Sequence, residues 1–245
     1  MLDYDGVAEG YDASRGGEAR AAATVEAVER LLPTRTSALL DVACGTGIVT
    51  MHLERPGRTV LGVDRSRGMI DLASRRVPHR MMLGDATRLP IKSAKVDAVV
   101  LIWLLHLLDD AGPVLAEGAR VLRAGGVLLT TVDKDEAAFS AESDVAAVTA
   151  RMRHEHAIRA SDRFERVVEL AAGHGLRLVG DTTFAGSGQG WSPRQWREQI
   201  AEGHIHWSRE ADPARVTRLC RDLSSLPDQD VARPDPLYRL IALSS

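Results

Sequence analysis

The sequence has little of what nucleic-acid binding requires. Aromatic residues make up only 4% of the 245 residues, too few for a surface on which bases would stack. Basic residues do not predominate either, because 31 Lys and Arg are set against 34 Asp and Glu, for a formal net charge of -3 at pH 7. This balance disfavours a strongly basic binding surface. We therefore expect no nucleic-acid partner.

Long apolar runs and paired cysteines are also missing. No stretch reaches the roughly 18 apolar residues of a transmembrane helix, so we expect no membrane partner. The first twenty residues carry acids and no apolar segment, which is not the pattern of a signal peptide. Cys44 and Cys220 form no CxxC pair and are too few for a disulfide framework. These absences predict a reduced, cytoplasmic protein.

What the sequence does contain is an alternation of apolar strands and amphipathic helices. This order is typical of a parallel sheet with helices on both faces. Strands are predicted at 38–43, 59–63, 80–83, 96–103, 127–132, 176–184 and 237–243, and helices at 18–32, 48–53, 66–76, 113–122, within 140–172, from 193 to about 203, and at 213–223. We therefore expect a single α/β domain over residues 1–245, with a doubly wound, mostly parallel seven-stranded sheet.

The turn after the first strand carries the most specific motif, Asp41-Val42-Ala43-Cys44-Gly45-Thr46-Gly47. A glycine-rich turn that leads into a helix lets a ligand approach the backbone and the helix N-terminus. A dinucleotide site would have three glycines in the spacing G-x-G-x-x-G, and the third is missing here. Asp41 would also repel a pyrophosphate, whereas it suits a ligand with an ammonium group. A nicotinamide oxidoreductase is therefore disfavoured.

This turn and four later segments resemble the class I S-adenosylmethionine (SAM)-dependent methyltransferases. The matching segments, in order, are 41–47, Asp64, 84–86, 96–100 and 120–128. The resemblance implies that Asp64 binds both ribose hydroxyls and that Asp85 accepts from the adenine amino group. The plainer alternatives are a helix cap at Asp64 and a solvated loop acid at Asp85. The resemblance implies further SAM contacts at Asp41, Ala43, Gly45, Thr46, Gly47, Arg65, Met69, Ala86, Ile102 and Trp103.

Two positions depart from the pattern of this family. Ala43 stands where glycine is more common, and we expect it to be tolerated because the position needs only a small side chain. Ala124 stands where the family usually has proline. The resemblance also implies that the last strand runs antiparallel to its neighbours.

Both flanking segments resemble those of small-molecule methyltransferases related to the ubiquinone and menaquinone enzymes. The pairs Tyr4-Asp5 and Tyr11-Asp12, with Arg15, resemble a cap that closes over the SAM pocket. Residues 1–33 are then a helical cap in which Tyr11 and Arg15 contact SAM or substrate, and 185–230 form a lid inserted before the last strand. Tryptophans of the lid could line the acceptor pocket or pack the lid helices on the sheet. The candidate acceptor residues are Trp191, Trp196, His204, His206 and Trp207.

His106 is the candidate catalytic residue, because it follows the fourth strand, where this family lines its active site. Histidine is a suitable base near neutral pH. The alternative is a structural histidine that bonds to the backbone. The pairs His154/His156 and His204/His206 have HxH spacing, but residues two apart do not share a helix face and no third ligand stands nearby in the sequence. We therefore expect no metal site.

The function expected from the resemblance is methyl transfer from SAM to a small-molecule acceptor, by O-, N- or C-methylation, with release of S-adenosylhomocysteine. The alternative is a SAM-binding regulatory or structural subunit that transfers no methyl group. Residues 102–105 lack the Asn/Asp-Pro-Pro-aromatic tetrapeptide of many DNA methylators, which further disfavours a nucleic-acid acceptor. We expect a monomer or a homodimer.

Overall fold

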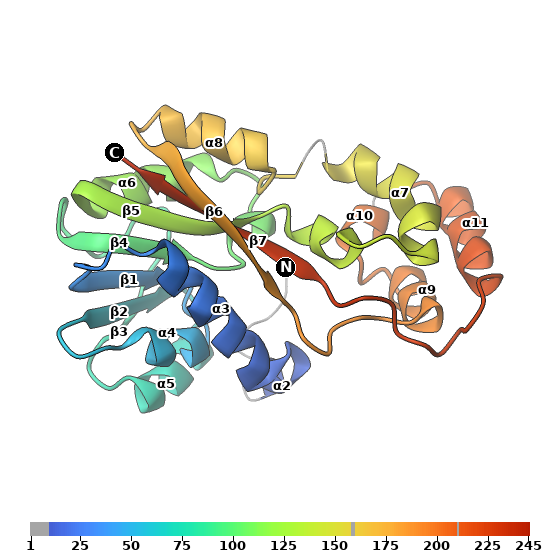
Figure 1. The fold of residues 1–245 in the computed structure, drawn as a ribbon, viewed down its shortest axis with the longest axis horizontal. Coiled ribbons are helices and arrows are strands. Elements are labelled where there is room, and N and C mark those ends of the chain that lie inside the picture. Colours follow the sequence, from blue (N-terminus) through green and yellow to red (C-terminus); the bar gives the residue numbers. More distant parts are fainter. Residues whose placement is uncertain (1–9, 158–159, 210) are drawn as a thin grey trace.

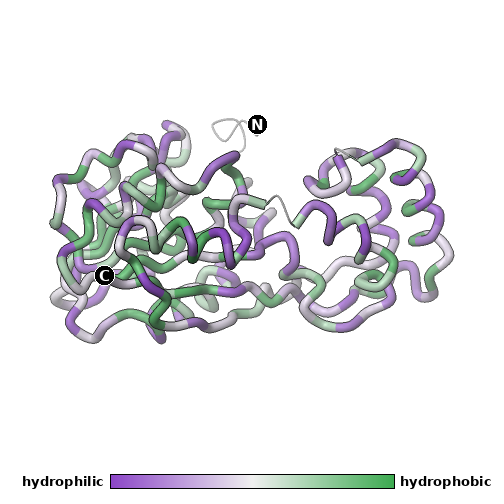
Figure 2. Tube along the Cα trace, turned by 90° about the horizontal axis from the view of Figure 1, so that it is seen from above, coloured by the Kyte–Doolittle hydropathy of each residue, from purple (hydrophilic) through white to green (hydrophobic). Residues whose placement is uncertain are grey.

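The computed structural model describes residues 10–157, 160–209 and 211–245, so the Tyr4-Asp5 pair lies outside the described residues. The chain forms two parts that lie side by side along the long axis, a sheet flanked by helices and a separate helical lobe (Figures 1 and 2). The N-terminal helices lie against the front of the sheet part (Figure 1). In the described part of the chain, no helix is both long and apolar enough to cross a membrane.

Within the described residues, the sheet has seven strands in the order β3-β2-β1-β4-β5-β7-β6. They are β1 (Ala38–Val42), β2 (Thr59–Asp64), β3 (Met81–Leu83), β4 (Val96–Leu101), β5 (Leu122–Val132), β6 (Arg177–Ala185) and β7 (Leu237–Ser244). Strands β1 to β5 pair in parallel, and β7 pairs antiparallel to both β5 and β6. The predicted mostly parallel seven-stranded sheet is confirmed, including its antiparallel last strand.

Helices cover both faces of the sheet, because the central strands carry buried apolar residues on both sides. In β1, Leu40 and Val42 belong to one apolar core and Leu39 to the other, as the two-residue period of a strand requires. One core lies under α6 and α8, and the other lies under α3 and α4. These helices and α5 are α3 (Gly17–Leu31), α4 (Ile48–Leu53), α5 (Arg67–Arg76), α6 (Gly112–Val121) and α8 (Phe164–Ala172).

The helical lobe is built from two insertions, one after β5 and one before β7. It comprises α7 (Asp144–Ala157), α9 (Pro193–Ala201), α10 (His206–Arg209) and α11 (Pro213–Ser224). These helices bury a core of their own, formed by Val145, Met152, Trp196, Ile200, Trp207, Leu219 and Leu223. The lobe therefore extends beyond the predicted lid at 185–230, because α7 supplies one side of its core.

A glutamine connects the N-terminal helices to the segment that leads into the lobe. Gln189 Nε2 donates to the Arg15 carbonyl at 2.7 Å, and Gln189 Oε1 accepts from the Tyr238 hydroxyl at 3.0 Å. On the segment that leads from the lobe back to β7, the Arg233 guanidinium makes a bidentate pair with Asp144, at 2.7 and 2.6 Å. The lobe is thus tied to the last strand and to the N-terminal helices by specific polar contacts.

Candidate cofactor and acceptor site

The acids and the glycine turn predicted to bind the cofactor lie along one edge of the sheet, where the parallel strands end. The chain runs from β1 outward to β2 and β3 and then returns to pair β4 on the other side of β1. Such a reversal of strand order leaves a crevice beyond the carboxyl ends of the strands, which is where ligands bind in open α/β sheets. Asp64 ends β2, Asp85 follows β3, and the turn at 43–47 follows β1. The helical lobe lies beyond the same edge (Figure 1).

The turn after β1 depends on three residues with left-handed backbone. Gly45 and Gly47 have φ of 56° and 76°, which glycine adopts at no steric cost. A Cβ at Gly47 would come within 3.0 Å of Ala73 on α5, whereas one at Gly45 would meet nothing within 4 Å. Gly47 therefore permits close helix packing, and Gly45 leaves open space beside the backbone. A ligand can approach the chain at Gly45.

Ala43 adopts the same left-handed region, with φ of 59°. A left-handed conformation costs an L-residue about 1–2 kcal/mol relative to glycine. The reason for glycine at this position in the family is therefore the backbone angle, rather than the small side chain that we assumed from the sequence. The chain tolerates Ala43, but with strain.

Asp64 holds the glycine turn against the end of β2. Its Oδ2 accepts from the Gly45 N–H and its Oδ1 from the Ser66 N–H, both at 2.9 Å. Ser66, rather than Asp64, caps α5, since its hydroxyl accepts from the Met69 N–H. Each oxygen of a carboxylate has a second lone pair. The geometry of Asp64 thus fits the predicted pair of ribose hydroxyls.

The other residues predicted to contact SAM differ in how much of their surface is exposed. Asp85 is exposed, and its Oδ1 accepts from the N–H and the hydroxyl of Thr87, both at 2.8 Å. These two bonds hold the pKa of Asp85 below its usual range, and Arg65 adds to the effect. By contrast, Met69 and Ile102 are buried, and Ala86 is half-buried. These assignments stay predictions.

Asp41 is buried directly beneath the turn. Its Oδ2 accepts from the Thr50 hydroxyl at 2.6 Å. Burial raises the pKa of Asp41 to about 7; the Thr50 bond opposes this rise, and the charge of Asp64 adds to it. A bound ammonium group would favour the ionised form, as expected for a ligand with a positive charge. The neighbouring Cys44 is buried too, which raises the pKa of its thiol and makes it a poor nucleophile.

The N-terminal helix α2 (Tyr11–Ser14) is anchored on the glycine turn through Asp12. The Asp12 carboxylate accepts from the Thr46 hydroxyl and from Arg76 Nη2, both at 2.6 Å. Arg76 also donates to the Thr46 carbonyl at 2.8 Å. Sequence reasoning selected Tyr11 and missed Asp12 and Arg76, although the repeated Tyr-Asp pair was visible. Tyr11 is half-buried, with the exposed Arg15 guanidinium 5.6 Å from its ring centre.

An aromatic wall stands at the end of β4, around Trp103. This residue has a φ of 54°, and its ring meets Phe184 and Tyr238 edge-on, with ring centres 5.9 and 5.6 Å apart. The buried Arg20 guanidinium lies 3.3 Å from the centre of the Trp103 ring. Arg20 escaped sequence analysis because it sits beside the apolar face of α3. Trp103 Nε1 and Arg20 Nε are buried and have no hydrogen-bond partner within the described residues.

His106 lies in the short helix η2 (Leu105–Leu107), just beyond this wall. Burial lowers the pKa of His106 to about 3, and the charge of Lys134 lowers it further. The imidazole is therefore neutral at physiological pH and a weak base, since a general base works best with a pKa near the operating pH. Its Nδ1 is buried without a hydrogen-bond partner among the described residues. The backbone-bonded alternative does not account for this nitrogen.

The five candidate acceptor residues of the lobe do not form one surface. Trp196 and Trp207 are buried in the core of the lobe, and Trp191 stacks on Trp196 with ring centres 4.8 Å apart. This favours the packing alternative, with the helices packed on one another rather than on the sheet. His204 is exposed beside Glu202, whereas His206 faces Asp135.

Comparison with known proteins agrees with this geometry. A family model described as a methyltransferase domain matches residues 40–130. A demethylmenaquinone methyltransferase of Mycolicibacterium paratuberculosis is 33% identical over 169 residues, which cover 65% of this chain and 69% of that protein. A malonyl-acyl-carrier-protein O-methyltransferase of Serratia marcescens is 34% identical over 134 residues. That match covers 52% of each protein, so the chain spans about half the length of this relative.

Solved structures show the same fold. Geranyl diphosphate C-methyltransferase from Streptomyces coelicolor superposes with a TM-score of 0.53 at 15% identity, over 91% of this chain and 78% of that one. Together with the glycine turn and Asp64, these matches define the class of protein. The chain belongs to the class I SAM-dependent methyltransferases, a family of enzymes whose cofactor is SAM.

The strain at Ala43 predicts a stabilising substitution. Ala43→Gly should raise the free energy of unfolding by about 1 kcal/mol, because glycine adopts the left-handed angle without cost. The matched control is Ala22→Gly on the exposed side of α3, which should lower it by about 1 kcal/mol. Urea denaturation measures both. Equal destabilisation by the two substitutions would show that position 43 is unstrained.

The buried carboxyl of Asp41 predicts a pH-dependent stability. Between about pH 4 and pH 7 the unfolded chain has released this proton while the folded protein retains it, so stability falls as the pH rises through that window. Asp41→Asn removes this effect. The variant should therefore gain stability over the wild type from pH 4 to above pH 7, by on the order of a few kcal/mol.

Denaturation of the ligand-free protein at pH 4, 5.5 and 7.5 measures this difference. Asp71→Asn, which removes an exposed carboxylate on α5, serves as the control and should show no such trend. Wild-type and Asp41→Asn stabilities that change in parallel with pH would contradict the raised pKa.

Proposed function

We propose that the protein transfers the methyl group of SAM to a small-molecule acceptor and releases S-adenosylhomocysteine. The observation that carries this proposal is the convergence of three features at one sheet edge. They are the open backbone at Gly45, the Asp64 carboxylate bonded to it, and the buried acid Asp41 beneath. The relative named for demethylmenaquinone supports a small acceptor.

Each part of the edge has a role in binding. Asp64 would hold the ribose hydroxyls, Asp85 the adenine amino group, and Asp41 the positive methionine end. Residues of the turn, Ala43 to Gly47, would contact the methionine part through their backbone. The bound cofactor supplies a methyl group already activated by its sulfonium. The protein then needs mainly to orient the acceptor and exclude water.

The acceptor side has a distinct charge pattern. Arg20, Arg15 and Lys134 all act electrostatically on His106, together with Asp135. We infer that the acceptor carries an acidic group near these cations. Because His106 is a weak base, the reacting atom should be one that is already nucleophilic without proton removal by this residue. An amine nitrogen, an ionised oxygen and a nucleophilic carbon meet this condition. The role we propose for His106 is a hydrogen bond to the acceptor rather than proton removal.

Closure over the site would come from the N-terminal helix and the lobe. Asp12 already joins α2 to the turn, Tyr11 lies on that helix, and Arg15 is its C-cap residue. We propose that this helix excludes water from the cofactor. We further propose that the enzyme acts in the cytoplasm, has no nucleic-acid partner, and is a monomer or a homodimer. The free thiols of Cys44 and Cys220 suit a reducing compartment.

Calorimetric titration with SAM, S-adenosylhomocysteine and NAD tests the cofactor assignment. The first two should bind with micromolar affinity and NAD should not. Asp64→Ala should weaken SAM binding by about 100-fold or more, because two charge-assisted hydrogen bonds are lost. Asp71→Ala, an exposed carboxylate on α5, should bind like the wild type. Folding of each variant is checked by thermal melting.

Two outcomes would overturn parts of this proposal. If SAM and S-adenosylhomocysteine both fail to bind folded protein, the cofactor assignment is wrong. If they bind but no acidic small-molecule acceptor yields S-adenosylhomocysteine, the alternative of a SAM-binding subunit without methyl transfer gains support.

A further inference from the structure

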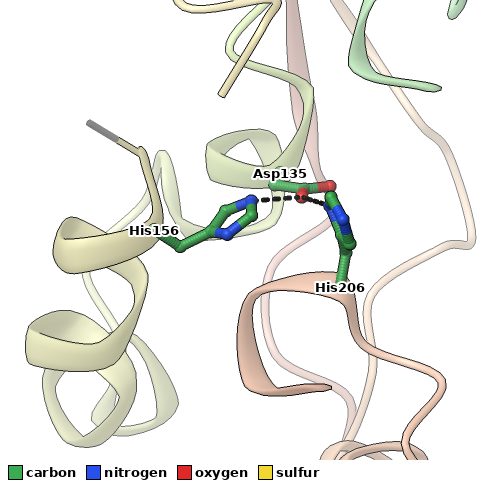
Figure 3. Close-up of side chains that lie close together, drawn as sticks. All are labelled: Asp135, His156 and His206. Carbon is green, nitrogen blue, oxygen red and sulfur yellow. Dashed lines mark ion pairs between the residues drawn. The ribbon is translucent and has the colours of Figure 1, made fainter. Parts of the chain in front are cut away.

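Three side chains from distant segments meet between the sheet and the lobe (Figure 3). Asp135 lies on the helical turn η3 (Lys134–Phe139) directly after β5, His156 on α7, and His206 at the start of α10. Each HxH pair contributes only one histidine to this cluster, so the two histidines of a pair do not lie in the same site. The sequence spacing that argued against a metal site therefore does not describe the arrangement in space.

The distances within this cluster are those of groups that face one another across a small gap. Asp135 Oδ2 lies 3.8 Å from His156 Nε2 and 4.0 Å from His206 Nδ1, both too long for hydrogen bonds. The two imidazole rings meet edge-on, with centres 4.7 Å apart and planes at 75°. One potential ligand atom from each residue lies within 4.8 Å of the other two. Figure 3 shows the Asp135 carboxylate between the two imidazoles, with one nitrogen of each ring directed toward the same carboxylate oxygen.

An ion fits that space after only a small contraction. Metal bonds to imidazole nitrogen and carboxylate oxygen are about 2.0–2.2 Å long, which places neighbouring ligand atoms about 3–3.5 Å apart. The two distances from Asp135 Oδ2 to the histidine nitrogens, 3.8 and 4.0 Å, exceed this range by about half an ångström or less, and the two nitrogens lie within 4.8 Å of each other. Rotation of the side chains is enough to close the difference, because His206 is on the surface, with 54% of its side chain exposed.

We propose that Asp135, His156 and His206 bind a divalent transition-metal ion of the Zn²⁺ or Fe²⁺ type. Two imidazoles and one carboxylate suit these ions, whereas Mg²⁺ and Ca²⁺ prefer oxygen ligands throughout. Three protein ligands leave at least one coordination position open, as in catalytic rather than structural sites.

The surroundings of the carboxylate suit this role. Lys134 Nζ is the competing cation, and it lies 3.4 Å from Oδ1, the other carboxylate oxygen. Oδ2 is the oxygen that both histidines face. The ammonium group therefore does not occupy the metal position.

The site has a place in the proposed reaction, a role that rests on the proposed function whereas metal binding itself does not. His106 follows β4 and Asp135 follows β5, its neighbour in the sheet, so the ion would lie at the same sheet edge as the proposed acceptor position. An oxygen atom of an acidic acceptor could fill the open coordination position. The ion would also join α7 and α10 of the lobe to the end of β5, fixing the lobe against the sheet part.

Metal titration of the complete chain, with any histidine tag removed, tests the site. Zn²⁺ is followed by calorimetry, and Co²⁺ by its visible absorption, which reports the ligands directly. We expect one ion per chain with micromolar affinity or better, and no comparable binding of Mg²⁺. Asp135→Asn and His206→Ala should each weaken binding at least 10-fold.

The chain supplies matched controls in the other member of each histidine pair. His154→Ala and His204→Ala remove an exposed imidazole close to the site and should leave the affinity unchanged. The proposal is overturned if Zn²⁺ and Co²⁺ do not bind, if binding survives both Asp135→Asn and His206→Ala, or if the controls lose it equally. Titration with S-adenosylhomocysteine in the presence of a chelator is read separately, so failure of the metal site and failure of the cofactor assignment are distinguishable.

Discussion

The hydrogen bond between the Gly45 N–H and the Asp64 carboxylate is the contact on which the site depends. It joins the turn after β1 to the end of β2, the two strands on one side of the reversal in strand order. Thr46 lies on the same turn, and its hydroxyl donates to Asp12 of the N-terminal helix α2. A ligand at this edge therefore meets groups whose positions are already fixed by the sheet, and only the helices above must adjust.

Most of the sheet part could be predicted from sequence because local patterns determine it. The strands are apolar runs bounded by turn residues, and Ser192 and Gln195 form the predicted capping box of α9. The lobe was harder, because its core joins α7 to helices inserted much later in the chain. An amphipathic helix shows that it must bury one face, but not which partner covers that face. The lid predicted at 185–230 was therefore incomplete.

The candidate site residues show the same difference between local patterns and contacts across the fold. Asp41, Gly45 and Asp64 were recognisable because the motif is continuous or follows a strand end. Arg20 and Asp12 were missed, since their roles come from contacts with Trp103 and Thr46 across the fold. The left-handed angle at Ala43 shows a further limit, because a residue name does not report the backbone angle that it must adopt. Only the three-dimensional structure shows whether Ala43 fits this position without strain.

The charges around His106 link the two ends of the site. Removing an imidazole from water disfavours its protonated form, and the nearby cations Lys134 and Arg20 act in the same direction. Asp135 opposes them, but it is shared with His156 and His206. A positive ion held by those three residues would neutralise the negative charge of Asp135 and so weaken His106 further as a base. The same ion would strengthen the attraction for an acidic acceptor, so the arrangement favours binding and orienting the acceptor over proton removal from it.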